Sequence, residues 1–174
     1  MPDTVLIING ATRVNGNTDI IIEKIIEGAK NNGVNVKFIN LREKKIANCI
    51  GCYQCLREST CSFDDDMTYI RKYINETEVM ILASPLYWCG VTGLMKTFLD
   101  RLFFYYHSKN RTLIAGKQVI IVTPMNQKDI GVESEPYSRV LQTAFQMSWS
   151  QDCRYGFLCW YYGERSSAEQ TRTS

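Results

Sequence analysis

The sequence predicts an α/β fold, a three-layer sandwich in which helices cover both faces of a five-stranded parallel sheet. Short apolar runs rich in β-branched residues alternate along the chain with segments whose apolar residues recur at helical spacing. Such alternation is typical of parallel strands joined by helical crossovers. The length of 174 residues suits one domain, so we expect residues 1–174 to form a single unit.

The first strand and helix have the clearest patterns. Residues 4–9 form an apolar, β-branched run, which predicts a strand buried on both faces. Residues 18–32 place four isoleucines on one helical face, and Asn17 or Thr18 can cap this helix at its start. Gly33 is expected to end the helix in a left-handed conformation.

An edge strand, a loop and a second helix follow. Residues 34–40 alternate apolar and polar side chains, which predicts an edge strand exposed on one face. We expect the next three basic residues to be a solvated strand end: Arg42, Lys44 and Lys45. Residues 46–62 are a cysteine-rich insertion loop. A helix over 66–75 begins at three aspartates, 64–66, whose charges favour a capping and dipole role.

The second half of the chain continues the alternation. The expected strands and helices are 78–84, 93–106, 117–123, 136–149 and 154–161, of which the second and fourth are helices. Residues 125–134 are expected to form a polar loop, and residues 163–174 a polar tail. Four consecutive aromatic residues, 103–106, surround a whole helical turn, so part of them is expected at a subunit interface.

The burial patterns also predict the order of the strands. Strand 34–40 has the edge pattern, whereas strands 4–9, 78–84 and 117–123 are largely apolar. This agrees with the flavodoxin-like order 2-1-3-4-5, in which ligands bind at the carboxyl ends of the strands beside the switch point. We therefore expect a site in the loops after residues 9, 84 and 123, with the cysteine-rich loop at the same end of the sheet.

The loop after the first strand has the composition of a phosphate site. It contains Gly10, Arg13 and Gly16 among hydroxyl and amide side chains, and it opens a helix, whose N-terminal N–H groups can bind phosphate. The glycine spacing is neither G-x-G-x-x-G nor a Walker loop. A mononucleotide phosphate therefore fits better than a dinucleotide pyrophosphate, and an ordinary capped turn is the alternative.

The loop after strand 78–84 carries two aromatic residues, Tyr87 and Trp88, between a proline and two glycines. A planar ring could lie against them, with backbone groups reading its polar edge, and core packing is the alternative. Cys89 in the same loop is expected to be a packed thiol. We expect core or surface thiols at Cys153, just before the last strand, and at Cys159, within it. We expect a structural role for the single histidine, His107, at a helix end.

Four of the seven cysteines are closely spaced, as Cys49-x2-Cys52-x2-Cys55-x5-Cys61. Thiolates at such intervals can turn toward one metal centre, and a compact C-x2-C-x2-C pattern with a more distant fourth cysteine is an iron–sulfur arrangement. A four-cysteine zinc site usually pairs two C-x2-C knuckles, and this chain has no second knuckle. The cysteines could instead form disulfide bonds or remain free thiols.

Composition argues against several classes of partner. The formal net charge is +2 and the basic residues are scattered, which gives no electrostatic case for nucleic acid or an anionic membrane. No apolar run approaches the roughly 20 residues of a membrane span, and no signal peptide is evident. We expect a cytoplasmic protein with reduced thiols.

Three segments together resemble the flavodoxin-like NAD(P)H-dependent FMN reductase superfamily, and within it the iron–sulfur flavoproteins. The segments are GATRVNGNT, NCIGCYQCLRESTCSFDDDM and ASPLYWCGVTGLMKTFLDR, and the resemblance covers about residues 4–125. Ala11 stands where that family usually has a small hydroxyl residue. Ser59 and Thr60 stand where a glycine is common before the fourth cysteine.

The resemblance implies FMN and a 4Fe–4S cluster, with NAD(P)H as one candidate reductant. It implies that the FMN phosphate lies against Thr12, Arg13, Asn17 and Thr18. It implies a ring-binding loop formed by Pro85, Leu86, Tyr87, Trp88, Cys89 and Gly90. It implies that Cys49, Cys52, Cys55 and Cys61 hold the cluster. It also implies a homodimer or homotetramer in which the cluster of one chain approaches the flavin of a neighbour.

These observations lead to one principal hypothesis and two competing ones. The principal hypothesis is an FMN-dependent oxidoreductase that passes electrons between FMN and a 4Fe–4S cluster, with a small molecule or a protein as electron partner. No side chain is assigned as a general acid or base. The first competing hypothesis is an NAD(P)H-dependent FMN or quinone reductase with FMN alone, and the second is a zinc-stapled binding module without a redox role.

Overall fold

The computed structural model describes the chain except residues 1–3, 126–134, 136–138, 140–153 and 162–174. Five strands form one parallel sheet of order β2-β1-β3-β4-β5, which confirms the predicted topology. The strands are β1 Thr4–Asn9, β2 Asn35–Asn40, β3 Val79–Ala83, β4 Gln118–Met125 and β5 Arg154–Tyr161. The predicted helix 136–149, the tail 163–174 and Cys153 lie outside the described residues.

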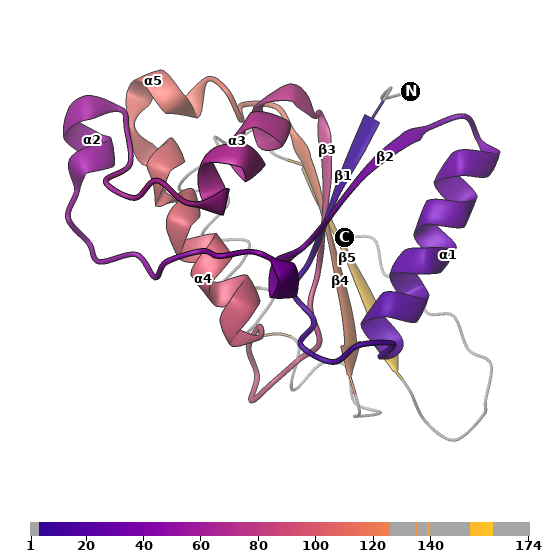
Figure 1. Ribbon diagram of the computed structural model, residues 1–174. Helices are drawn as coiled ribbons and strands as arrows, with labels where there is room; N and C mark the ends of the chain where they lie inside the picture. The colour runs from indigo at the N-terminus through magenta and orange to yellow at the C-terminus, as the bar shows by residue number, and fades with distance from the viewer. Residues whose placement is uncertain (1–3, 126–134, 136–138, 140–153, 162–174) are drawn as a thin grey trace.

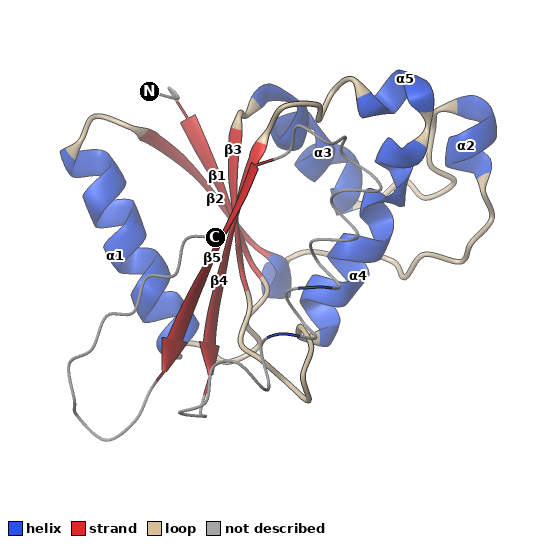
Figure 2. Ribbon diagram, turned by 180° about the vertical axis from the view of Figure 1, so that it is seen from behind, coloured by secondary structure: helices blue, strands red, loops and turns tan. Residues whose placement is uncertain are grey.

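Helices cover both faces of the sheet. The α-helices are α1 Asn17–Asn31, α2 Gln54–Glu58, α3 Asp66–Glu76, α4 Gly93–Arg101 and α5 Ser108–Arg111, with 3-10 turns at η1 Leu41–Glu43 and η2 Leu102–Tyr106. Helix α1 lies on one face, whereas α3 and α4 lie on the other, with α2 and α5 outside them (Figures 1 and 2). The described helices include none with the length and apolar character that a membrane span needs.

Apolar burial explains these layers. Every residue of β3 is buried, as expected of a central strand covered on both faces. Ile22 of α1 packs in a smaller apolar cluster on one side of the sheet. On the other side, Phe98 of α4 and Tyr105 of η2 are fully buried in a larger cluster. The sheet therefore holds the carboxyl ends of β1, β3 and β4 at fixed positions beside one another.

Several predicted boundaries were wrong in detail. The expected loop 46–62 contains the short helix α2, and the expected helix 93–106 is helical only to Arg101 before it tightens into η2. Strand β4 runs to Met125, two residues beyond the predicted end. Helix α1 begins after Gly16, and no side chain caps it, so neither Asn17 nor Thr18 is the cap. Gly33 does take the left-handed conformation, with φ of 71°.

Candidate functional site

A cavity of about 530 Å³ lies at the carboxyl ends of β1, β3 and β4, where the sheet topology places the switch point. Its lining combines the loop after β1 with the loop after β3 and the end of β4: Ala11, Arg13, Asn15, Gly16, Asn17, Thr18, Pro85, Leu86, Tyr87, Pro124 and Met125. Six of the predicted site residues are thus brought together. Thr12 lies beside them, with its hydroxyl oxygen 3.3 Å from the hydroxyl of Tyr87.

Asn9 and Asp19 hold the loop after β1 from beneath. Asn9 is fully buried at the end of the strand, where its side-chain oxygen accepts the Ala11 N–H at 2.9 Å and its Nδ2 donates to Asp19 at 2.7 Å. Asp19 in turn accepts the N–H of Asn15, a residue with positive φ. Burial would raise the pKa of the Asp19 carboxyl, but hydrogen bonds from Arg42, Asn9 and Asn15 outweigh it and hold that pKa below its ordinary value.

Arg42 completes this support and is not the solvated residue that we predicted. Its guanidinium pairs with both oxygens of Asp19, at 3.0 and 3.2 Å, and donates to the carbonyls of Ala11 and Arg13 at 3.3 Å each. Those carbonyls are therefore engaged away from the cavity. The first N–H groups of α1, which no side chain caps, belong to residues that line the cavity. This arrangement presents donors and a helix dipole to an anion.

The loop after β3 ends in a tight hairpin turn. Tyr87 and Gly90 exchange two backbone hydrogen bonds, of 2.9 and 3.0 Å, and both central residues, Trp88 and Cys89, have positive φ. This is the geometry of a type I′ turn, which usually takes Asn-Gly. Trp88 is fully exposed, so core packing is wrong for it, and Cys89 is an exposed thiol rather than the packed one that we predicted. These two residues and Gly90 form the turn beyond the cavity lining.

Thr92 ties the two cavity loops together. Its buried hydroxyl donates to the carbonyl of Gly10 and accepts the N–H of Met95, which caps α4. The backbones approach closely here, because a Cβ on Gly10 would lie 2.7 Å from the Cβ of Met95. Glycine at position 10 is therefore required by packing against α4.

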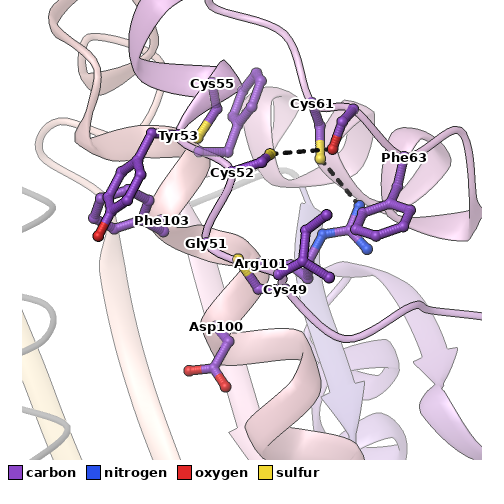
Figure 3. A pocket seen from close by; sticks show the side chains of 13 residues that line it. Cys49, Gly51, Cys52, Tyr53, Cys55, Cys61, Phe63, Asp100, Arg101 and Phe103 are labelled. Atoms are coloured by element: carbon purple, nitrogen blue, oxygen red, sulfur yellow. Dashed lines mark hydrogen bonds between the residues drawn. The ribbon is translucent and has the colours of Figure 1, made fainter.

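A second cavity lies among the four clustered cysteines. All four line it, together with residues of η2 and the end of α4 (Figure 3). The space between them is about 30 Å³, and Cys49 and Cys52 are exposed at its edge. Within the described ranges, no three His, Cys, Asp or Glu side chains are grouped so as to hold a single metal ion.

The four thiols are close enough to influence one another's pKa. Burial raises the pKa of the Cys55 thiol, and the nearby Cys61, Cys49 and Cys52 raise it further. A hydrogen bond with the Ser62 hydroxyl, at 3.3 Å, is the main cause of a lowered pKa at Cys52. The four cysteines thus form one group around the cavity.

Left-handed residues turn the backbone around this group. Gly51, Tyr53 and Ser59 have φ of 64°, 56° and 61°, which reverses the chain between successive cysteines. Ser59 lies two residues before Cys61 and ends α2. Its carbonyl accepts a hydrogen bond from Asn110, and its hydroxyl lies 3.4 Å from Nδ1 of His107. A serine, supported by α5 and its N-cap, therefore forms the turn where the resemblance led us to expect a glycine.

His107 lies at a helix end, as predicted, because it directly follows η2. It lies between η2 and α5 and is the N-cap of α5, where its Nδ1 accepts the N–H of Lys109 at 3.1 Å.

Arg101 and Asp65 anchor the far side of the cysteine loop. Asp65 caps α3 and accepts the N–H groups of Met67 and Ala47. Arg101 pairs with both oxygens of Asp65 and donates to the sulfur of Cys61 at 3.3 Å. Burial raises the pKa of Asp65, but the bonds from Arg101, Ala47 and Met67 lower it more, so the net shift is downward. The predicted capping role of the aspartates is confirmed at Asp65.

The two cavities share no lining residue and lie near opposite ends of α4. The turn at 87–90 precedes α4, whereas Asp100 and Arg101, at its end, line the cysteine cavity. A helix of nine residues is about 13 Å long. The cysteine loop starts at the predicted end of the sheet, after β2 and η1, but it then runs away from the first cavity. The two cavities therefore do not lie side by side.

Sequence patterns did not reveal Asn9, Asp19, Arg42 and Arg101. Asn9 and Asp19 had a usable signal, since a buried polar residue at a strand end and an acidic residue in the first helical turn often support a loop. No sequence signal indicated Arg42 or Arg101, because the partner of each lies far away in the sequence and comes close only in the folded chain.

Comparisons with known proteins identify the family. The chain matches the sequence model of the NADPH-dependent FMN reductase family over residues 4–147. It is 36% identical over 108 residues to an iron-sulfur flavoprotein of Archaeoglobus fulgidus, covering 62% of this chain and 48% of that protein. It is 32% identical over 127 residues to an iron-sulfur flavoprotein of Clostridioides difficile, covering 68% and 52%. The chain therefore spans about half the length of these relatives.

Solved structures show the same fold. The NAD(P)H:quinone oxidoreductase from Methanothermobacter marburgensis superposes with a TM-score of 0.71 at 13% identity, covering 91% of this chain and 87% of that one. At this identity the likeness concerns the fold alone.

Proposed function

Because the chain belongs to the NADPH-dependent FMN reductase family, we propose that it is an FMN-dependent oxidoreductase whose cysteine cavity holds a 4Fe–4S cluster. The observation that carries the proposal is the cavity at the switch point, where an uncapped helix N-terminus faces a loop with an aromatic side chain. FMN supplies hydride or single-electron chemistry when bound, and the cluster supplies single-electron transfer.

The chain's own residues supply the phosphate end of the FMN site. Arg13 is the charged side chain in the cavity lining, and the N–H groups at the start of α1 are available to an anion. Arg42 does not serve as a second phosphate ligand, because Asp19 neutralises it beneath the loop. One free charge plus a helix terminus suits a single phosphate group.

The ring end of the FMN site is formed by Pro85, Leu86 and Tyr87 together with Pro124 and Met125. The N–H of Leu86 donates to the carbonyl of Pro124, which fixes the two walls relative to each other. These largely apolar walls would exclude water from one side of a flat ring. Trp88 and Cys89, on the exposed turn, lie where a second chain or an electron partner could reach the site.

The cysteine group suits a cluster better than a single ion. A zinc ion needs every sulfur at about 2.3 Å from one centre. In a 4Fe–4S cluster each thiolate binds a different iron, so the sulfurs stand farther apart. Four neighbouring thiols that line one cavity, which is open at Cys49 and Cys52, support this assignment. Membership of a reductase family argues against the zinc-stapled binding module.

The separation of the two cavities supports transfer between chains. Within one chain the length of α4 lies between them, so a neighbouring chain in a homodimer or homotetramer would bring a cluster closer to a flavin. We propose such an assembly, in a cytoplasmic protein, with NAD(P)H, another small molecule or a protein as the electron partner.

A second candidate is a reductase with FMN alone. The small space between the thiols, about 30 Å³, favours it, because a cluster would require the exposed loop to move outward. The two candidate functions predict different iron contents for the purified protein.

Anaerobic purification followed by flavin, iron and sulfide analysis tests the proposal. We expect one FMN and about four irons per chain. Cys55→Ala should lose the iron and keep FMN, whereas Cys89→Ala, which changes a thiol outside the cysteine cavity, should keep the iron. A wild-type protein that contains FMN but no iron would support the FMN-only reductase instead. A protein that binds no FMN in titration would overturn the proposal.

A further inference from the structure

Arg101 places a buried positive charge against one of the four cysteines. Its side chain is only 2% exposed, and Nη2 lies 3.3 Å from the sulfur of Cys61, to which it donates (Figure 3). A guanidinium cannot lose its proton in a protein, so this donor is permanently charged.

Several contacts fix the direction of this donor. Nη1 donates to the carbonyl of Ala47 at 2.8 Å and to Asp65 at 2.6 Å, and Nη2 reaches the other oxygen of Asp65 at 3.2 Å. The ring of Phe63 lies 4.9 Å from the guanidinium carbon. These three hydrogen bonds fix the guanidinium plane, so the fourth N–H stays aimed at Cys61.

The other three thiols lack an equivalent partner among the described residues. The sulfur of Cys52 contacts neutral groups, the hydroxyl of Ser62 at 3.3 Å and the backbone N–H of Gln54, while Arg57 donates to the carbonyl of Cys52 rather than to its sulfur. No described side chain forms a hydrogen bond with the sulfur of Cys49 or Cys55. The cysteine group is therefore electrostatically uneven, with its most positive corner at Cys61.

We propose that Arg101 is a positioning residue that raises the reduction potential of the cluster through Cys61. This inference rests on the proposed function. One electron from the donor adds negative charge that the thiolate sulfurs share, while no bond breaks and no proton moves. A fixed cationic N–H at Cys61 stabilises the reduced state more than the oxidised state.

A redox titration of the anaerobically purified holoprotein tests this role. At the wild-type midpoint, Arg101→Gln should lower the ratio of reduced to oxidised cluster about tenfold, which equals about 59 mV for one electron. Arg101→Lys keeps the charge without the planar fork and should shift the potential less, in the same direction.

Arg71 offers a matched control. Its guanidinium is also buried and lies 4.6 Å from the ring of Phe104, which lines the cysteine cavity, but it contacts none of the four sulfurs. Arg71→Gln removes the same charge and should shift the potential much less than Arg101→Gln. Equal shifts in the two variants would show a general charge effect and overturn the role of the bond to Cys61.

The possible outcomes separate this inference from the proposed function. A wild-type protein without iron would overturn both, whereas four irons with unchanged potentials in the Arg101 variants would overturn only the inference. If neither Arg101 variant retains iron, the test uses wild-type protein from cells grown with 15N-labelled arginine. Pulsed electron paramagnetic resonance of its reduced cluster should then show a 15N coupling, and the lack of one would contradict the proposal.

Discussion

At the scale of single residues, Asp19 and Arg42 fix the conformation of the loop after β1, although neither residue belongs to it. Asp19 lies in the first turn of α1 and Arg42 lies in η1, yet together they bind the N–H of Asn15 and the carbonyls of Ala11 and Arg13. The loop after β1 is thus shaped before any ligand arrives. Such preorganisation lowers the entropy cost of binding.

The first prediction concerns this pair. Asp19→Asn should weaken FMN binding by about ten- to a hundredfold, because a charge-assisted hydrogen bond is worth about 1.5–3 kcal/mol. Arg42 would keep its charge without a carboxylate and would compete for the phosphate at the wrong position. Fluorescence titration with FMN measures the effect. Glu27→Gln breaks only the exposed pair with Lys24 on the same helix and should leave the affinity unchanged.

The same pair has a defined pH dependence. The folded-state pKa of Asp19 is depressed, so its stabilising contribution is complete above the unfolded value of about 3.9 and is lost as pH falls through the lower folded value. Urea unfolding should therefore show the destabilisation by Asp19→Asn at neutral pH and a smaller difference at about pH 2–3. A difference that stays constant down to that pH would contradict the assigned pKa shift.

At the scale of elements, the cysteine loop depends on short pieces of structure that its sequence barely signals. Helix α2 has five residues and α5 has four, too few for a periodic pattern to show. Their function is to hold a strained turn, since Ser59 has the positive φ that glycine adopts more easily.

The second prediction follows from that turn. Ser59→Gly should stabilise the chain by about 0.5–1 kcal/mol, because glycine adopts this φ without a Cβ clash. The gain is reduced by the loss of the hydroxyl contact with His107. Thermal unfolding measures it. Thr60→Gly, at a neighbouring position without positive φ, should give no gain, and equal or lower stability of the Ser59 variant would refute the assignment of strain to this turn.

At the scale of the whole molecule, the loops at the carboxyl ends of the strands are exposed, whereas the helices pack an apolar interior against the sheet. Phe98 in the middle of α4 is fully buried beneath the sheet, whereas Trp88, on the turn that precedes the same helix, is fully exposed. The aromatic residues 103–106 are divided in the same way, with Tyr105 buried and Tyr106 partly exposed. The interface role predicted for the exposed members stays a prediction.

The third prediction compares the two aromatic residues that differ most in burial. Phe98→Ala should lower the free energy of unfolding by about 3–5 kcal/mol, the usual cost of removing a buried aromatic ring. Trp88→Ala should change it by less than about 0.5 kcal/mol. Urea denaturation of both variants measures this. A large effect at Trp88 in dilute protein would mean that the side chain is buried in the assembled protein.

The strands, their order and the place of the first cavity follow from the sequence alone. Apolar runs such as 78–84 identify buried strands locally, and a parallel sheet then brings the loops around Arg13 and Tyr87 together. Periodicity also identified the apolar face of α1, and the cysteine spacing marked the second site.

Which charged residues serve the two sites depends on the tertiary structure. Arg42 meets Asp19 across 23 positions, and Arg101 meets Cys61 across 40, so no local pattern records either contact. The course of the cysteine loop past α4 was decided in the same way, by packing of α3 and α4 against one sheet face with α5 outside them (Figures 1 and 2). Local patterns fix which face of an element is apolar, whereas the partners of a buried charge depend on where distant segments meet after that face is buried.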